Sequence, residues 1–221
     1  MKLRMTKGWV LAGALSVAAA AAPAQVLISE GFDNVGSLAS AGWLMANISS
    51  PVGSVSTWFQ GDASIFAAQS GAGNSYVASN YNVSAPGGEI SNWLITPTFS
   101  TAQAGTVSFW VKGANDPGFF DKLSFGFSSG GTAMTDFHLM TPVVAGSDWT
   151  QVTLSFAAGG AGSMGRLAIV HLGPDDTSDY VGIDNLVVTA AGVVPEPQTW
   201  LLMGLGLAGV GLIKSRRREA A

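Results

Sequence analysis

The chain has 221 residues, of which 48% are hydrophobic and 11% are charged, and its net charge at pH 7 is −4. An average soluble protein carries about 25% charged residues, so this composition excludes an intrinsically disordered protein and a coiled coil. The sequence contains no Cys, which excludes a disulfide framework, thiolate-zinc sites and cysteine nucleophiles. An isoelectric point near 4.9 argues against a nucleic-acid-binding protein.

The charges divide the chain into three parts. Seven of the ten Lys and Arg residues lie within the first seven or the last eight positions. Residues 25–194 between them hold twelve acidic and three basic residues, a net charge of −9. An acidic central domain therefore lies between two basic ends, and the length suits one domain with extra segments.

The first 24 residues have the pattern of a secretory signal peptide. A basic start is followed by an apolar run over residues 9–22, and Ala22-Pro23-Ala24 is a small-x-small cleavage site. The alternative is a retained membrane anchor, for which the run is short. We therefore expect signal peptidase to cleave after Ala24, which leaves an exported chain that begins at Gln25.

The central residues 25–194 alternate with the period of β-strands and show no helical period. In the segment 106–112, for example, Val107, Phe109 and Val111 share one face. The segment 167–172 is apolar on both faces, as in a central strand. The pattern predicts long strands over 106–112, 122–127, 152–156, 167–172 and 180–188.

Glycine-rich and proline-rich segments between these runs are turn signals. They include a G-x-G-x-x-G pattern at Gly160, Gly162 and Gly165, which precedes a strand instead of the helix that nucleotide binding needs, so we interpret it as a hairpin loop. Many short strands with frequent turns predict an all-β, antiparallel β-sandwich, and periodicity leaves jelly-roll and immunoglobulin-like topologies open. The other turn signals are residues 71–74, 84–88, 115–118 and 130–131.

The order of short motifs along residues 25–194 resembles the choice-of-anchor J domain, which is similar to MAM domains and to the cleaved adhesin domains of bacterial surface proteins. The resemblance implies a concanavalin-like jelly roll with a binding or adhesive role. The motifs that carry it include Glu30-Gly31-Phe32-Asp33, Trp58-Phe59-Gln60-Gly61, residues 92–97, residues 147–152 and Gly182-Ile183-Asp184-Asn185-Leu186.

Acidic residues at the two ends of the domain predict a calcium site. Hard cations prefer carboxylate and carbonyl oxygens, and the first and last strands of a sandwich commonly pair. The predicted ligands are Glu30 and Asp33 near the first strand, Asp184 and Asn185 on the last, and Asp62 from a loop. The alternative is a set of solvated turn acids.

A second acidic group lies just before the last strand, at Asp175, Asp176 and Asp179. Its spacing does not match the EF-hand loop. We therefore expect a solvated loop there.

Signatures of catalysis are missing from the sequence. The two histidines, His138 and His171, have no H-E-x-x-H context, and His171 is expected to be a packed, hydrogen-bonded residue. No G-x-S-x-G elbow occurs. The domain has only two glutamates, Glu30 and Glu89, and neither begins the Glu-x-Asp-x-x-Glu run of jelly-roll glucanases. We therefore expect a protein that is not an enzyme.

Three tryptophans are candidates for stacking on a sugar ring. Trp110 falls on the polar face of its predicted strand, and Trp58 and Trp149 are similar candidates. The alternative is that these large side chains pack under a loop or between sheets.

The C-terminal segment 195–221 has three parts. A Pro-rich sequence, Val194-Pro195-Glu196-Pro197, precedes an uncharged apolar run for which we expect a single transmembrane helix over 199–213. The basic cluster that follows, which includes Arg216, Arg217 and Arg218, predicts a cytoplasmic end. The alternative is a simple tail anchor.

This three-part tail resembles the PEP-CTERM sorting tail of Gram-negative bacteria. The resemblance implies recognition by an exosortase, a membrane transpeptidase that cuts near Pro195-Glu196-Pro197, and an envelope or extracellular protein that is often tied to exopolysaccharide and biofilm. The sequence therefore predicts an exported protein, membrane-anchored before processing, with a structural or adhesive role and extracellular polysaccharide as a possible partner. The alternatives are a carbohydrate-binding module and, less favoured, a glycan-active enzyme.

Overall fold

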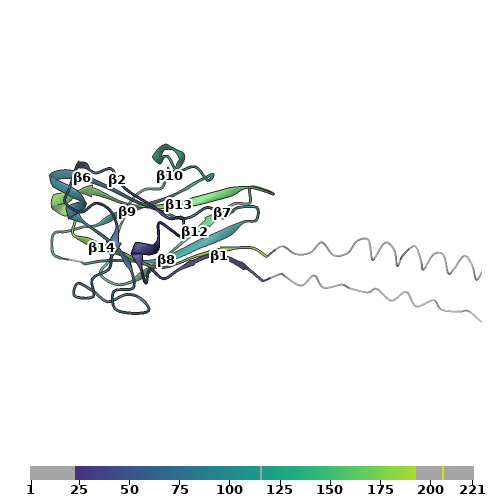
Figure 1. The fold of residues 1–221 in the computed structure, drawn as a ribbon, viewed down its shortest axis with the longest axis horizontal. Coiled ribbons are helices and arrows are strands. Elements are labelled where there is room, and N and C mark those ends of the chain that lie inside the picture. The colour runs from purple at the N-terminus through teal and green to yellow at the C-terminus, as the bar shows by residue number, and fades with distance from the viewer. Residues whose placement is uncertain (1–22, 115, 193–205, 207–221) are drawn as a thin grey trace, which may run out of the picture. The chain divides into compact units, whose positions relative to one another are not determined.

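A computed structural model describes residues 23–114 and 116–192 and the single residue Gly206. The body over Pro23–Gly192 is a sandwich of two antiparallel sheets, as the sequence predicts (Figure 1). Within these described residues the only helical segments in the sandwich are short 3-10 turns, and no helix is long and apolar enough to cross a membrane. The 3-10 turns are η1 (Val35–Ser37), η2 (Tyr81–Val83), η3 (Met134–Asp136) and η4 (Asp175–Thr177). Residues 1–22 of the predicted signal peptide, and the predicted transmembrane helix over 199–213 apart from Gly206, lie outside the described residues.

The first sheet has six strands, and the last strand of the domain lies at its centre. Strand β14 pairs with β8 along one edge and with β5 and β1 along the other. The sheet order is β12 (Thr150–Phe156), β8 (Gly105–Gly113), β14 (Tyr180–Ala190), β5 (Val77–Asn80) and β4 (Phe59–Gln60), with β1 (Gln25–Glu30) also on β14.

The second sheet has eight strands and is built around β13. The predicted central strand over 167–172 is the middle of β13, which pairs with β6 and with β9. The sheet order is β10 (His138–Leu139), β9 (Lys122–Ser128), β13 (Met164–Pro174), β6 (Ser84–Ile95) and β2 (Leu44–Asn47), with β11 (Val143–Val144) on β9, β3 (Ser50–Val52) on β6 and β7 (Phe99–Ser100) on β13.

Two predicted turns prove wrong. Residues 84–88 form the start of β6 instead, and Gly87 within it has a φ of 78°, which residues with a β-carbon rarely adopt. The glycine-rich segment 157–163 is not a hairpin loop, because β12 belongs to the first sheet and β13 to the second. It crosses between the layers instead.

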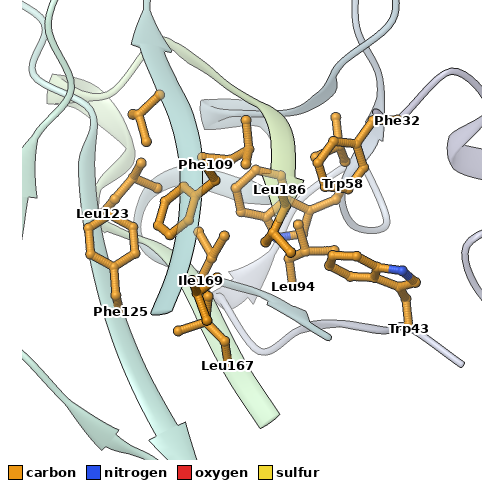
Figure 2. Close-up of a cluster of buried hydrophobic side chains, with 14 of the residues drawn as sticks. Phe32, Trp43, Trp58, Leu94, Phe109, Leu123, Phe125, Leu167, Ile169 and Leu186 are labelled. Atoms are coloured by element: carbon orange, nitrogen blue, oxygen red, sulfur yellow. The ribbon is translucent and has the colours of Figure 1, made fainter. Parts of the chain in front are cut away.

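The core lies between the two sheets. Figure 2 shows Phe109 and Phe125, from opposite sheets, among the side chains that meet there, and their ring centroids are 5.1 Å apart. Fully burying one such side chain stabilises a fold by about 1.5–3 kcal/mol. The alternation that predicted β8 is confirmed, since Val107, Phe109 and Val111 are all buried.

A β-bulge in β14 lets both halves of this strand contribute to the core. Ile183 and Leu186 are both fully buried in the main cluster, although strict alternation would put residues three apart on opposite faces. The register against β8 shifts between Asp184 and Val187, and Asn185 is the inserted residue, with φ of 48°. Asp184, just before the bulge, is left on the outer face opposite Trp110.

Candidate functional site

The candidate site is the outer face of the first sheet, where the loop over residues 61–76 covers β14. The backbone N–H groups of Gln69 and Ser70 donate to Asp184 Oδ2 at 2.8 and 3.2 Å, and the Asn185 N–H donates to Asp184 Oδ1 at 2.6 Å. Burial raises the pKa of the Asp184 carboxyl, and these three bonds oppose the shift. Asp184 therefore fastens the loop to the sheet.

Beside Asp184, the first and last strands of the domain run antiparallel, with Glu30 opposite Leu186. Glu30 Oε1 accepts a hydrogen bond from the Phe32 N–H at 2.8 Å. A β-carbon placed on Gly31 would lie 3.9 Å from both Asn185 Oδ1 and Asp33 Oδ2. The structure thus brings Asp33 and Asn185 to one place beside Asp184, as expected from strand pairing.

Backbone strain is concentrated at this crossing of β1 and β14. Among the described residues, Phe32 and Asn185 are the two non-glycine residues with positive φ, at 54° and 48°. The left-handed conformation costs an L-residue roughly 1–2 kcal/mol, and Asn tolerates it better than Phe. Such strain clusters at functional sites, where the surrounding structure holds it in place.

Asp62, the fifth predicted calcium ligand, lies apart from this crossing. Its carboxylate accepts hydrogen bonds from the Ser64 N–H and Oγ at 2.8 and 2.7 Å, and these bonds lower its pKa. Its backbone N–H is within 3.0 Å of the hydroxyls of Tyr76 and Tyr180. None of its hydrogen bonds reaches the other four predicted ligands, so the structure gives Asp62 a role in shaping the loop.

The oxygen donors at the crossing suit a hard cation in chemical type. Both Asp184 oxygens already accept backbone hydrogen bonds. The oxygen atoms left as ligands for a cation are those of Asp33, Asn185 Oδ1 and the second carboxylate oxygen of Glu30. Within residues 23–114 and 116–192, no three acidic or histidine side chains have the spacing of a metal site. Backbone carbonyls would have to complete any coordination shell.

The three candidate tryptophans occupy different environments. Trp58 is only 2% exposed and lies in the main core, so its predicted role in stacking on a ligand is wrong (Figure 2). Trp149 packs edge-on against Phe66 and donates its Nε1–H to the Ala67 carbonyl at 3.0 Å, so the loop covers part of its ring. Trp110 is half-buried on the outer face, between Gln151 and Asp184 in register.

His171 belongs to a buried polar chain that links the two sheets. Its Nδ1 is hydrogen-bonded to Ser79 Oγ of β5 at 2.9 Å, and its Nε2 lies 3.2 Å from Asp121 Oδ1 without forming a hydrogen bond. Ser79 Oγ also accepts a hydrogen bond from Asn92 Nδ2 at 2.9 Å. His171 and Ser79 are fully buried, so this Ser-His-Asp arrangement is a structural brace that no substrate reaches, and the prediction of a packed histidine is confirmed.

Of the second acidic group, Asp176 is exposed as predicted, but the prediction of a solvated loop is wrong for Asp175. Asp175 begins η4, is only 8% exposed, and accepts a hydrogen bond from the Gly87 N–H at its Oδ2. Asp121 Oδ1 and Oδ2 accept hydrogen bonds from the N–H groups of Asp179 and Tyr180, which fixes the start of β14. Sequence reasoning missed this arrangement because η4 folds back against β6, a strand whose first residues were predicted to be a turn.

Comparisons with known proteins match two separate parts of the chain, the C-terminal tail and the sandwich. Residues 193–218 match the model of the PEP-CTERM protein-sorting motif. The chain carries this sorting motif. It includes the predicted sorting residues Val194, Pro195, Glu196, Pro197, Arg216, Arg217 and Arg218, which lie outside the described residues, and it indicates export with a C-terminal anchor before sorting.

Solved structures with the same fold include the K1 and K3 cleaved adhesin domains of Lys-gingipain from Porphyromonas gingivalis. The K1 domain is 22% identical, with a TM-score of 0.57 over 75% of this chain and 98% of that one. The K3 domain is 21% identical, with a TM-score of 0.54 over 74% and 98%. These likenesses show the fold, and the resemblance to the choice-of-anchor J domain stays a prediction. No curated protein matches the sequence.

Proposed function

We propose that the protein is a surface or extracellular-matrix binding protein of a Gram-negative bacterium, released from its membrane anchor by an exosortase-type transpeptidase. The PEP-CTERM motif at residues 193–218 carries this proposal, because it is a sorting signal that follows the compact sandwich of Pro23–Gly192 in the sequence. The shared fold with domains named cleaved adhesins supports a binding role. Extracellular polysaccharide, as in a biofilm matrix, is the proposed ligand, and the domain is proposed to be non-catalytic.

Cell fractionation tests the sorting part of this proposal. The full chain should be found at the cell surface or in the medium with its tail removed. A variant lacking residues 195–221 should lose surface retention, and Glu196→Gln, which removes one charge from the motif, should slow removal of the tail. Recovery of the full chain from the cytoplasm with both ends intact would contradict the proposal.

A carbohydrate-binding module that stacks a sugar on Trp110 is the second candidate. Its support is the position of this ring on the outer face, with a polar neighbour on either side. In a pull-down with extracellular polysaccharide, Trp110→Ala should lower binding about tenfold, which corresponds to about 1.4 kcal/mol. Trp110→Phe is the matched control and should retain most of the binding, and equal binding by all three proteins would remove this candidate.

Structural calcium at the crossing of β1 and β14 is a further part of the proposal. Glu30, Asp33 and Asn185 would hold the ion, whose positive charge would offset the acidic surroundings of Asp184. At calcium concentrations near 100 times the dissociation constant, we expect a gain of about 2.7 kcal/mol, or about 5–10 °C in Tm. Asp33→Asn should abolish the gain and Asp148→Asn should not, and an unchanged Tm at millimolar calcium would dismiss the site.

A further inference from the structure

A cavity of about 450 Å³ lies at the end of the sandwich where β14 begins. Four of its lining side chains are acidic: Asp116, Asp175, Asp176 and Asp179. Two aromatic rings share the lining, Tyr81 at 44% exposed and Phe119 at 41%. This acidic pocket is separate from the calcium crossing and from Trp110, which do not contribute to its lining.

The carboxylates of the acidic pocket are left without positive partners. Among the described residues, the only nitrogen of a Lys, Arg or His side chain within 4 Å of a carboxylate is His171 Nε2, which lies near Asp121 and not near an acid of the pocket. Asp175, although nine-tenths buried, has one oxygen, Oδ1, with no hydrogen-bond partner, and Asp179 Oδ2 is likewise buried without one. Leaving a buried acceptor unpaired is costly, so both atoms call for a donor that the described part of the chain does not supply.

Mutual repulsion among these acids supports the same conclusion. Burial raises the pKa of Asp179 to about 6, and the charges of Asp121 and Asp116 add to the shift. The Asp116 carboxylate also lies close enough to hydrogen-bond the protonated Asp179. A bound cation would relieve the repulsion that now favours a proton.

The size and lining of the acidic pocket favour an organic cation over a bare metal ion. No three of its acidic side chains have metal-ligand spacing, and about 450 Å³ falls within the range of small-molecule sites. Exposed aromatic faces attract ammonium groups and also cover the apolar face of a sugar ring. Carboxylates beside aromatic rings are therefore suited to a protonated amine carried on a ring.

We propose that the acidic pocket binds amino-sugar units of a polysaccharide, with the ammonium group among Asp116, Asp175 and Asp179 and the sugar ring against Tyr81 and Phe119. The choice of a polysaccharide rests on the proposed function. The inference that the ligand is positively charged rests only on the carboxylates of the pocket. The ammonium group donates to the two unpartnered oxygens, and Asp176 at the rim adds attraction.

Calorimetry with two matched oligosaccharides tests this assignment. The full chain, purified in mild detergent with EDTA at pH 7, is titrated with a glucosamine tetramer and with the corresponding N-acetylglucosamine tetramer. The free-amine tetramer should bind at least tenfold more tightly, and raised salt should reduce the difference. Equal binding of the two tetramers, or binding of neither, would overturn the assignment.

Variants locate the binding. The double variant Asp116→Asn/Asp176→Asn changes two exposed residues, so it should fold and should lose at least tenfold in affinity for the free-amine tetramer. Asp148→Asn changes an exposed acid outside the pocket and should keep full affinity. An equal loss of affinity in this control would show that binding depends only on general charge attraction, and it would overturn the proposal.

A pentalysine peptide separates the two polymer classes. If it binds more tightly than the glucosamine tetramer and depends on Asp116, the ligand is a basic peptide and the amino-sugar assignment is wrong. If neutral polysaccharides bind the chain while the free-amine tetramer does not, this inference fails and the proposed function stands. If no polysaccharide binds, both fail.

Discussion

Two acidic clusters of the sandwich use the same side chain in opposite ways. At the crossing of β1 and β14, Asp184 accepts three backbone hydrogen bonds and is fully satisfied. In the acidic pocket, Asp175 and Asp179 each keep a buried oxygen without a partner. The Asp184 carboxylate is therefore used to hold the loop on the sheet, whereas Asp175 and Asp179 each keep an acceptor oxygen for the proposed ligand. Net charge alone would not distinguish them, since hydrogen bonding decides which carboxylates are available.

The largest expected effect tests the structural cluster. Asp184→Ala leaves the N–H groups of Gln69, Ser70 and Asn185 without their acceptor, so we expect a loss of about 3 kcal/mol in the free energy of unfolding. Urea denaturation measures the loss, and faster hydrogen exchange at residues 69 and 70 would locate it. Asp184→Asn keeps one acceptor oxygen and should lose about half as much, whereas a loss below 0.5 kcal/mol for the alanine variant would break the comparison.

The brace between the sheets should give the next largest effect. Ser79→Ala removes the hydroxyl that both His171 and Asn92 contact, so we expect a loss of about 2 kcal/mol. The lower Tm should come with weaker anchoring of Asp121, seen as faster hydrogen exchange at the N–H groups of Asp179 and Tyr180. Ser79→Thr keeps the hydroxyl and is the control. A fully stable alanine variant would show that the polar contacts of Ser79 and His171 do not brace the two sheets.

Asp179→Asn should have the opposite sign, because this acid is repelled in the folded state. Its pKa near 6 lies above the ordinary value of 3.8, so its contribution to stability is full below pH 3.8 and is lost as the pH rises through 6. That difference corresponds to about 3 kcal/mol, and partial exposure reduces it to about 1 kcal/mol. The variant should match the wild type at pH 3.5 and exceed it at pH 7 in thermal unfolding, and a less stable variant at pH 7 would contradict the comparison.

The smallest effect is expected at Asp62, which belongs to neither cluster. Asp62→Asn keeps an acceptor oxygen for Ser64 in an exposed loop, so the Tm should not change measurably. The same variant should keep the full calcium response proposed for the crossing. Loss of the calcium-dependent rise in Tm would show that Asp62 is a calcium ligand after all.

The sequence predicted the sandwich well because strand alternation is a local property. Val107, Phe109 and Val111 face the core as their spacing requires. The pairing of the first and last strands was also foreseeable, since it needs only a general property of sandwiches. Trp58 shows the limit, because an amphipathic side chain in an irregular segment has no period that reveals whether its ring is covered.

The acidic pocket could not be predicted for a different reason. Its residues come from three separate segments of the chain, and the partner of Asp175 is the backbone N–H of Gly87, which leaves no trace in residue type. The sequence showed only that acids are close together before the last strand. Whether such acids meet water or one another depends on tertiary packing.

The central position of β14 has a mechanical consequence. This strand is 11 residues long, or about 36 Å, and it runs from Tyr180, the residue after Asp179 of the acidic pocket, to Ala190, just before the sorting motif. A pull between a ligand at one end and a cell-surface attachment at the other would load β14 lengthwise. Hydrogen bonds to β8, β5 and β1 lie along both edges of β14. Under such a load these bonds would have to break together in shear, so the strand would resist tension.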